Sequence, residues 1–319
     1  MAQQSLAKKP NTQPVFSVFM KQENIKNLVQ QAVGKDAQRF TAAIISAVSN
    51  NPALQKCEQS TILSAALLGQ GLNLSPSPQL GHYYLVPFED RKNNRTVAQF
   101  QIGYKGYIQL AMRSGQYTDL DVIEIKEGEY KGKDKKTGKT VFEFIEDDDV
   151  REGLPTVGYM AYFELVNGFR KQIYWTKGKM LSHADKYSPA FSKDGEMVHT
   201  RYGDKQKVSY EDFVAGNYDP NDAWLYSSFW YKSFDEMAFK TMLRQLISKW
   251  GIMSIEMQDA FTHDDAVIGE NGEPSYVEYN GEVNAVDYEG EKLDPVDAVP
   301  VTAEESAEFD FFNEGEGNK

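Results

Sequence analysis

The sequence predicts an α+β fold: N-terminal helices packed with a short antiparallel sheet and a long late helix, followed by a disordered acidic C-terminal tail. Three observations predict this class. Apolar residues recur with a helical period from Ser17 to Asn73, alternate with a period of two from Pro76, and return to a helical period from Ala223 to Trp250. The chain has 319 residues, 41% of them hydrophobic, which is enough for one large domain or two smaller ones.

Three helices are expected in the N-terminal part of the chain. The apolar faces of the first two consist of Ile25, Leu28, Val29, Ala32 and Val33, and of Phe40, Ile44, Ile45 and Val48. Asn51-Pro52 interrupts this pattern, because proline ends or kinks a helix. A third helix follows from Ser60 and closes near Gly71. Its apolar positions fit either the core or a contact between subunits.

The period of two then predicts strands, with helices between and after them. Strands are expected over 82–88, 97–102, 122–130, 139–145, 157–165 and 171–175, and helices over 107–114, 177–184 and 223–250. The polar segment 89–95 and the Asn167-Gly168 pair have the composition of hairpin turns. Residues 188–222 are polar and predict irregular structure.

The net charge of −13 is unevenly distributed. Sixteen acidic and two basic residues lie from Asp265 to Lys319, so the rest of the chain holds 32 basic and 31 acidic residues. The pI therefore says little about what the body binds. We expect a disordered leader over 1–16, a folded body over 17–262 with a mobile lobe around 176–222, and a disordered tail over 263–319.

Two segments of the sequence look at first like enzyme motifs, but neither matches the motif of a nucleotide-hydrolysing or metal-dependent enzyme. GKDKKTGKT, residues 132–140, has five residues between glycine and Gly-Lys-Thr where a phosphate loop needs four, and a strand pattern follows it instead of a helix. The acidic run 146–149 suits a solvated turn better than a two-metal nuclease, whose carboxylates come from separate strands. The four histidines lack ligand spacing, and Cys57 is the single cysteine. We therefore expect no enzyme activity, no metal cofactor and no use of ATP, although Mg²⁺ can still help by screening the charges of a bound polyanion.

The first residues contain no apolar segment of the kind found in a secretory signal, and no apolar run approaches 18 residues. This pattern predicts a cytoplasmic protein that does not associate with a membrane.

Basic residues beside aromatic ones predict a surface that binds a polyanion, although a solvated face is the simpler explanation for any single lysine. On the late helix, Lys240 and Arg244 lie four residues apart and outside the apolar stripe, so they could hold two phosphates of one strand. Other candidates are Tyr104, Lys105, Arg113, Lys126, the lysines from 131 to 139, Lys177, Lys179, Lys186, Lys232 and Lys249. A cationic pair near Trp230 and Tyr231 suits single-strand binding better than base-edge recognition.

Over roughly residues 17–262 the chain resembles the RecT family of phage single-strand annealing proteins. The resemblance rests on the order and spacing of NPALQKCEQSTILSAALLGQGLNL, LGHYYLVPF, IGYKGYIQLAMRSGQ, SFDEMAFKTMLRQL and IEMQDAF. It implies binding of single-stranded DNA, annealing of complementary strands without ATP through a duplex intermediate, and assembly of identical subunits into rings or filaments. It also implies a 5′→3′ exonuclease as partner.

The resemblance also assigns site residues. The family's Gly-Tyr-Lys/Arg-Gly block corresponds to Gly103, Tyr104, Lys105 and Gly106, its basic pair to Lys240 and Arg244, and its basic residue before Ser-Gly to Arg113. Glycines here would allow a sharp turn and close approach of another molecule, with an anion at the start of the following helix. The long insert 189–221 and the extended acidic tail depart from the family pattern.

Other functions remain open. A passive single-stranded DNA coat protein would protect a strand without accelerating annealing, and a phage nuclease or helicase component would need metal or ATP. The acidic tail, which ends near Phe309, Phe311 and Phe312, could be a solubilising segment, a competitor for the DNA site, or a docking motif for a host single-strand-binding protein.

Overall fold

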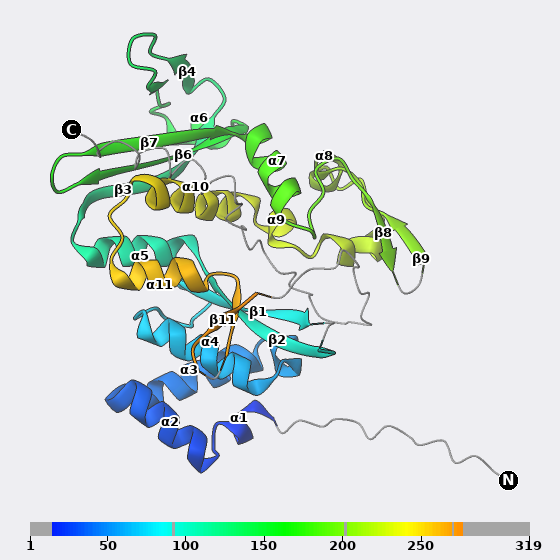
Figure 1. Ribbon diagram of the computed structural model, residues 1–319. Coiled ribbons are helices and arrows are strands. Elements are labelled where there is room, and N and C mark those ends of the chain that lie inside the picture. Colours follow the sequence, from blue (N-terminus) through cyan, green and yellow to red (C-terminus); the bar gives the residue numbers. More distant parts are fainter. Residues whose placement is uncertain (1–14, 91–92, 201–202, 270, 277–319) are drawn as a thin grey trace, which may run out of the picture.

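The computed structural model describes residues 15–90, 93–200, 203–269 and 271–276 (Figure 1). Nearly all of the expected leader, and the expected tail beyond residue 276, lie outside the described residues. The body is elongated: N-terminal helices form one end, a four-stranded sheet lies in the middle, and a three-stranded sheet forms the other end (Figure 1). The predicted α+β class is confirmed. Among the described residues, no helix is long and apolar enough to cross a bilayer.

The N-terminal end is helical, as predicted. Its elements are α1 (Phe16–Phe19), α2 (Glu23–Val33), α3 (Ala37–Ser49) and α4 (Gln59–Gly71), with the 3-10 turns η1 (Gly34–Asp36) and η2 (Leu54–Lys56). Ile44 and Val48 turn one face of α3 into the core, whereas α4 buries Ile62, Leu63 and Ala66 and lies against the middle sheet. Helix α4 is therefore part of the core of this chain.

The middle sheet contains a strand that the sequence analysis did not anticipate. Its antiparallel order is β1 (Tyr83–Asp90), β2 (Arg95–Ile102), β10 (Ala266–Ile268) and β11 (Pro274–Ser275). The expectation of a disordered tail over 263–319 is therefore wrong for residues 263–269 and 271–276. The short apolar sequence of β10 is fully buried, and the Asp265 N–H donates to the Phe100 carbonyl at 2.9 Å. A three-residue strand carries too little periodicity to stand out in an acidic segment.

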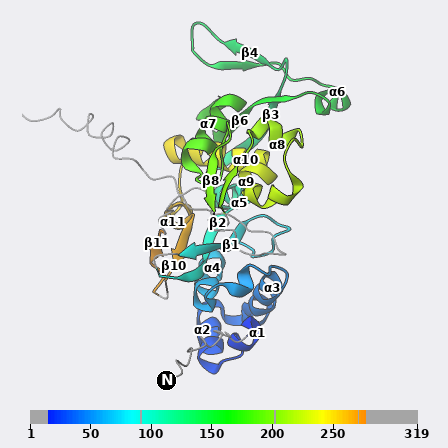
Figure 2. The ribbon, with the colours of Figure 1, turned by 90° about the vertical axis from the view of Figure 1, so that its right-hand side faces the viewer.

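The second sheet has the antiparallel order β3 (Tyr117–Lys126), β6 (Thr156–Leu165) and β7 (Arg170–Thr176). A hairpin of β4 (Tyr130–Lys133) and β5 (Thr140–Phe142) projects from it, and α6 (Asp148–Glu152) follows the hairpin (Figure 2). At the base of this hairpin, the Arg151 Nε lies 2.6 Å from an oxygen of the buried Glu129 carboxylate. This ion pair connects α6 to the start of the hairpin.

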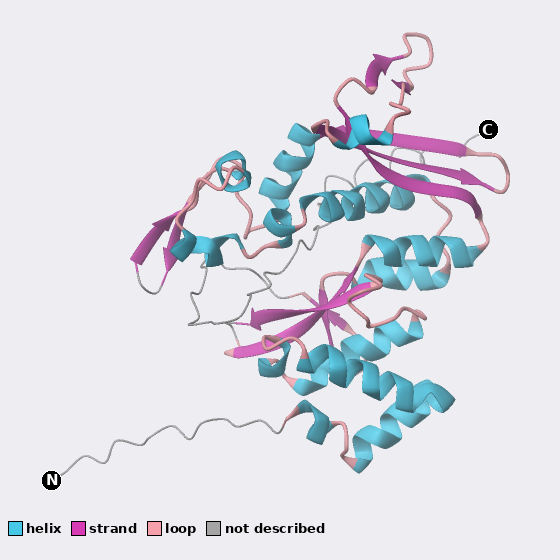
Figure 3. Cartoon of the chain, turned by 180° about the vertical axis from the view of Figure 1, so that it is seen from behind, coloured by secondary structure: helices cyan, strands magenta, loops and turns pink. Residues whose placement is uncertain are grey.

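The predicted single helix over 223–250 is three elements: η3 (Pro220–Tyr226), α9 (Phe229–Lys232) and α10 (Phe234–Trp250). The break falls at Ser233, whose backbone leaves the helical region at φ −143° and ψ 55°. Helix α10 lies along β3, β6 and β7 and beside α5 (Tyr104–Ser114), and α11 (Ile255–His263) also packs against α5 (Figures 1 and 3).

The polar segment 188–222 is more ordered than its composition indicates. It follows α7 (Lys177–Tyr187) and contains β8 (Met197–Thr200), β9 (Gly203–Gln206) and α8 (Tyr210–Val214). Aromatic rings of Phe191, Tyr210 and Phe213 pack around Tyr231 of α9. The Lys207 ammonium is buried and donates to the Ala190 carbonyl at 2.8 Å. The mobility expected for residues 176–222 stays a prediction.

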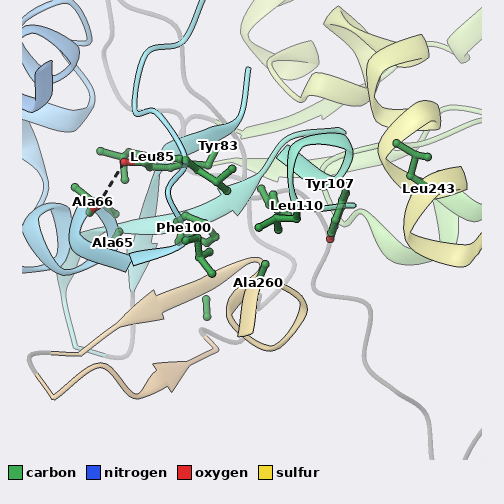
Figure 4. Packing of buried hydrophobic residues seen from close by; sticks show 14 of the residues in the cluster. Ala65, Ala66, Tyr83, Leu85, Phe100, Tyr107, Leu110, Leu243 and Ala260 are labelled. Carbon is green, nitrogen blue, oxygen red and sulfur yellow. Dashed lines mark hydrogen bonds between the residues drawn. The ribbon is translucent and has the colours of Figure 1, made fainter. Parts of the chain in front are cut away.

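The two sheets share a core that is continuous through α5. Tyr83 and Phe100 of the middle sheet pack with ring centroids 5.1 Å apart, and Tyr107 and Leu110 of α5 extend the cluster toward Leu243 of α10 (Figure 4). Helix α5 thus connects the two halves, and the residues at its N-terminus are positioned by both.

Candidate nucleic-acid interface

The two glycines before and inside the first turn of α5 are required by the chain's own backbone. A Cβ on Gly103 would lie 2.2 Å from the Gly81 carbonyl oxygen, and one on Gly106 would lie 2.1 Å from the His82 carbonyl oxygen. The Gly103 N–H donates to that same His82 oxygen at 2.9 Å. The expectation that these glycines admit an external molecule is therefore corrected: the segment preceding β1 occupies the space.

Lys105 remains an exposed cation at the start of α5. Its ammonium lies 5.6 Å from the centroid of the Tyr104 ring, and that half-buried ring packs edge-on against Phe239. The N-terminus of α5 has no side-chain cap. A cation next to the positive end of a helix dipole suits a phosphate group, so the predicted role of Lys105 is compatible with its position.

A shallow pocket lies beside this helix start. Aromatic side chains of Tyr84, Tyr104 and Phe229 line it together with the polar side chains of Gln101 and Glu236. Its volume of about 40 Å³ holds a few water molecules, well below the roughly 150 Å³ that a cavity needs to enclose a benzene ring. The pocket is therefore a contact surface rather than an enclosed ligand site.

The electrostatic field around this helix start is positive. Burial lowers the pKa of His82, and the charges of Arg113 and Lys105 lower it further. Burial is the larger cause of this shift, and the two nearby cations add to it, so a phosphate bound beside Lys105 would meet favourable charge.

Lys240 and Arg244 do not form the exposed basic pair that their spacing predicts. The Lys240 ammonium lies 3.2 Å from Asp264 and 3.4 Å from Asp265, and the Arg244 guanidinium lies 2.6 Å from Asp264. Tyr107 donates a hydrogen bond to the same Asp264 carboxylate at 2.9 Å. Lys240 is 8% exposed and the Asp264 side chain is fully buried. The predicted contact of this pair with two phosphates is corrected, because both charges are neutralised inside the fold.

The pKa shifts agree with this arrangement. Burial by itself would lower the pKa of Lys240, but the nearby Asp264 and Asp265 carboxylates raise it overall. Burial likewise opposes the charge of Arg244, and Tyr107 and Asp264 outweigh it to raise that pKa. These two aspartates were assigned to the tail in the sequence analysis. The only feature of the sequence that marked them was that two adjacent aspartates directly follow α11.

Arg113 has a structural role that its spacing did not suggest. Its guanidinium donates to the carbonyl of Leu72 at 2.6 Å and to that of Asn73 at 3.0 Å. These two carbonyls directly follow α4, whose last-turn carbonyls of Leu68, Gly69 and Gln70 accept backbone N–H groups. Arg113 therefore ties the residues after α4 to α5, and the Glu256 carboxylate of α11 is close enough to interact with its charge.

The remaining two predicted residues lie elsewhere. Lys186 is exposed near the end of α7, with its ammonium 4.9 Å from the Tyr187 ring centroid, and Lys232 is exposed at the end of α9. Tyr104 and Lys240 thus line one pocket, and Lys105 follows Tyr104 in the first turn of α5. Arg113 lies in the last turn of α5, and Lys186 lies on α7.

Two further features concern metal binding and the single thiol. No group of three or more histidine, cysteine, aspartate or glutamate side chains within them could hold a metal ion. Burial raises the pKa of Cys57 to about 12, so this thiol does not ionise near neutral pH and cannot be a nucleophile there.

Comparison with known proteins assigns the class. The RecT family matches residues 38–278, three quarters of the chain, and the protein therefore belongs to the RecT family, which acts in DNA recombination and strand annealing. Over 236 residues the chain is 36% identical to "Uncharacterized protein YqaK" of Bacillus subtilis (strain 168), covering 74% of this chain and 67% of that protein. Over 257 residues it is 27% identical to "Protein RecT" of Escherichia coli (strain K12), covering 77% of this chain and 79% of that protein.

Proposed function

We propose that this protein binds single-stranded DNA through the phosphate backbone and anneals complementary strands without ATP. The observation that carries the proposal is the family match over 38–278, which spans the start of α5 with its exposed Lys105. The positive field around His82 and the uncapped helix N-terminus support a phosphate site there. The neutralised Lys240 and Arg244 support α10 as a scaffold rather than a contact.

Annealing sets a physical condition on these contacts. A protein that gripped base edges would block pairing, so the contacts must go mainly to phosphates, which makes binding independent of sequence and sensitive to salt. Acceleration then comes from holding two strands at high local concentration in a shared register. One body of this size covers few nucleotides, so we propose a homo-oligomer, as a ring or filament, that covers a longer stretch.

Several further properties follow from the family and remain proposals. They are a cytoplasmic location, cooperation with a 5′→3′ exonuclease that supplies single strands, and a contact with a host single-strand-binding protein. None of these uses a metal ion or nucleotide held by this chain, and added Mg²⁺ would act only by screening strand repulsion.

The test mixes two complementary, dye-labelled oligonucleotides and follows duplex formation by energy transfer, with EDTA present and ATP absent. We expect the protein to accelerate annealing well above the spontaneous rate at equal salt. A coat protein would bind both strands and leave the rate unchanged or lower it. Strict dependence on ATP hydrolysis, or metal-dependent cleavage of the strands, would contradict the proposal and favour an enzyme.

A further inference from the structure

Lysines and aromatic rings alternate along a surface formed by β7, α7 and the end of α10. The Lys171 ammonium lies 4.3 Å from the Trp250 ring centroid, and the Lys179 ammonium lies 4.0 Å from the Trp175 ring centroid. Trp175 in turn contacts His183 on α7, with centroids 5.3 Å apart. We call Lys171, Trp175, Lys179, Lys186, Lys249 and Trp250 the lysine–tryptophan strip.

The strip carries positive charge that the described part of the chain does not compensate. Its four lysines form no ion pair with any described residue, although Arg170, next to Lys171, pairs with Glu164 at 2.8 Å. Burial lowers the pKa of Lys179, and the charge of Lys249 lowers it further. Cations that destabilise one another in this way gain most when an anion binds between them.

The aromatic rings of the strip are accessible as well. Trp250 is 39% exposed at the end of α10, and Trp175 is half-buried, whereas Trp230 of α9 is completely buried in the core. The lysine ammonium groups make favourable cation–π contacts with these rings, and the exposed part of Trp250 remains open to a further contact. Unpaired bases have flat faces that stack on such rings, while their phosphates meet the lysines.

We propose that the lysine–tryptophan strip is a binding surface for single-stranded DNA, in which the lysines hold phosphates and the indole rings of Trp175 and Trp250 stack against unpaired bases. The inference rests on the proposed function and adds a surface apart from the start of α5. Single strands fit better than a duplex, because paired and stacked bases do not expose their faces. Charge complementarity and ring geometry together favour this occupant over an uncharged or purely apolar partner.

The decisive comparison uses two double variants of equal charge change. Lys179→Ala with Lys249→Ala removes two strip lysines, and Lys21→Ala with Lys35→Ala removes two exposed lysines from the N-terminal helical end, outside the candidate DNA-binding residues. Affinity for a labelled oligothymidine is measured by anisotropy over a series of salt concentrations. The strip variant should bind at least about tenfold more weakly at low salt, with a log–log salt slope reduced by about 1.4. The control variant should bind like the unmodified protein.

A third variant tests stacking. Trp250→Ala should weaken binding by about 5- to 150-fold, since each stacked base contributes about 1–3 kcal/mol. Trp250→Phe, which keeps a ring, should recover much of that loss. The melting temperature of each variant must equal that of the unmodified protein, so that weaker binding does not reflect loss of the fold. Unchanged affinity of both the strip double variant and Trp250→Ala, or equal losses in the strip and control double variants, would overturn the proposal.

The acidic C-terminal part of the same chain is the alternative occupant. The double variants are therefore repeated in a chain that ends after residue 276, which keeps every strand of the middle sheet. A DNA surface predicts the same loss in both chain lengths. If the strip held the acidic segment instead, the strip variant of the full chain would bind DNA as tightly as the unmodified protein or more tightly, and the proposal would fail. Absence of DNA binding by the unmodified protein would instead refute the proposed function.

Discussion

The guanidinium of Arg244 and the carboxylate of Asp264 lie 2.6 Å apart inside the folded body, where the Asp264 side chain is fully buried. The same carboxylate accepts hydrogen bonds from the Tyr107 hydroxyl and the Ile102 N–H, both at 2.9 Å. Residues from α5, α10, β2 and the segment before β10 therefore meet at one charge. This contact ties the segment that leads into β10 to the centre of the molecule.

Loss of Arg244 should reduce stability rather than act directly on DNA binding. Arg244→Ala leaves Asp264 with less compensation, and removal of one partner from a buried pair costs about 3–5 kcal/mol. Denaturant unfolding should show this loss at neutral pH. Lys105→Ala, which removes an exposed cation, should stay within about 0.5 kcal/mol of the unmodified protein. An Arg244→Ala protein of normal stability would show that the buried pair contributes little.

Two truncations should separate the folded part of the acidic region from the rest. A chain that ends after residue 276 keeps Asp264, Asp265 and β10, and should unfold at nearly the same temperature as the full chain. A chain that ends after residue 263 loses these groups and leaves Lys240 and Arg244 buried without carboxylates. We expect it to unfold at a lower temperature by well over ten degrees or to be insoluble. Equal melting temperatures for the two chains would contradict the role of β10.

Lys105→Ala should weaken binding of all single-stranded sequences about equally. One lost phosphate contact reduces the log–log salt slope by about 0.7 for single strands. Titration of oligonucleotides of different composition at several salt concentrations measures both effects. Sequence-selective loss, or an unchanged slope, would show that Lys105 does not contact a phosphate.

Substitution of Gly103 should disrupt the junction between β2 and α5. In Gly103→Ala the new methyl group would lie 2.2 Å from a backbone oxygen, so the segment at residue 81 must move. We expect a loss of about 1–3 kcal/mol on denaturant unfolding, similar to an overpacked core. Gly71→Ala is the matched control, because nothing lies within 4 Å of a Cβ there and alanine favours a helix. A tolerated Gly103→Ala would contradict the close approach of the two backbones.

Stability should fall as the pH drops from 6.5 to about 4, partly because of His183. Burial first, and then the charges of Lys179 and Lys186, lower the pKa of His183 to about 4. The unfolded chain therefore takes up a proton near pH 6.5 while the folded chain does not, which favours unfolding increasingly down to pH 4. The full effect is about 3 kcal/mol.

Denaturant unfolding at pH 7 and pH 4.5 measures this difference, and His183→Gln should reduce it. The reference is the ordinary histidine value of 6.5 in the unfolded chain. If His183→Gln shows the same pH dependence as the unmodified protein, other groups account for all of the acid sensitivity.

Local sequence predicted much of the fold because its signals are local. The helical period identified α2, α3 and α4, and the alternation around 82–102 identified the β1–β2 hairpin in nearly its observed position. The Asn167-Gly168 turn placed the β6–β7 hairpin correctly. Errors fell where tertiary contacts dominate: β10 is too short to show a period, and the break at Ser233 interrupts a continuous helical pattern.

The candidate site was less predictable for a physical reason. Spacing on a helix shows that Lys240 and Arg244 share a face, but it cannot show which carboxylates cover that face. Asp264 lies 20 residues beyond Arg244, and only the path of α11 and β10 brings it back. The same limit applies to Arg113, whose acceptors are about 40 residues earlier in the chain.

By itself, the sequence determined the α+β class, the order of most elements and membership of the RecT family, because periodicity and ordered motifs are properties of the chain alone. Tertiary structure alone decided which basic residues remain available. It buries Lys240 and Arg244 against two aspartates, leaves Lys105 exposed, and gathers Lys171, Lys179 and Trp250 from separate elements onto one surface. A charge is free or neutralised according to its neighbours in space, and those neighbours come from distant parts of the chain.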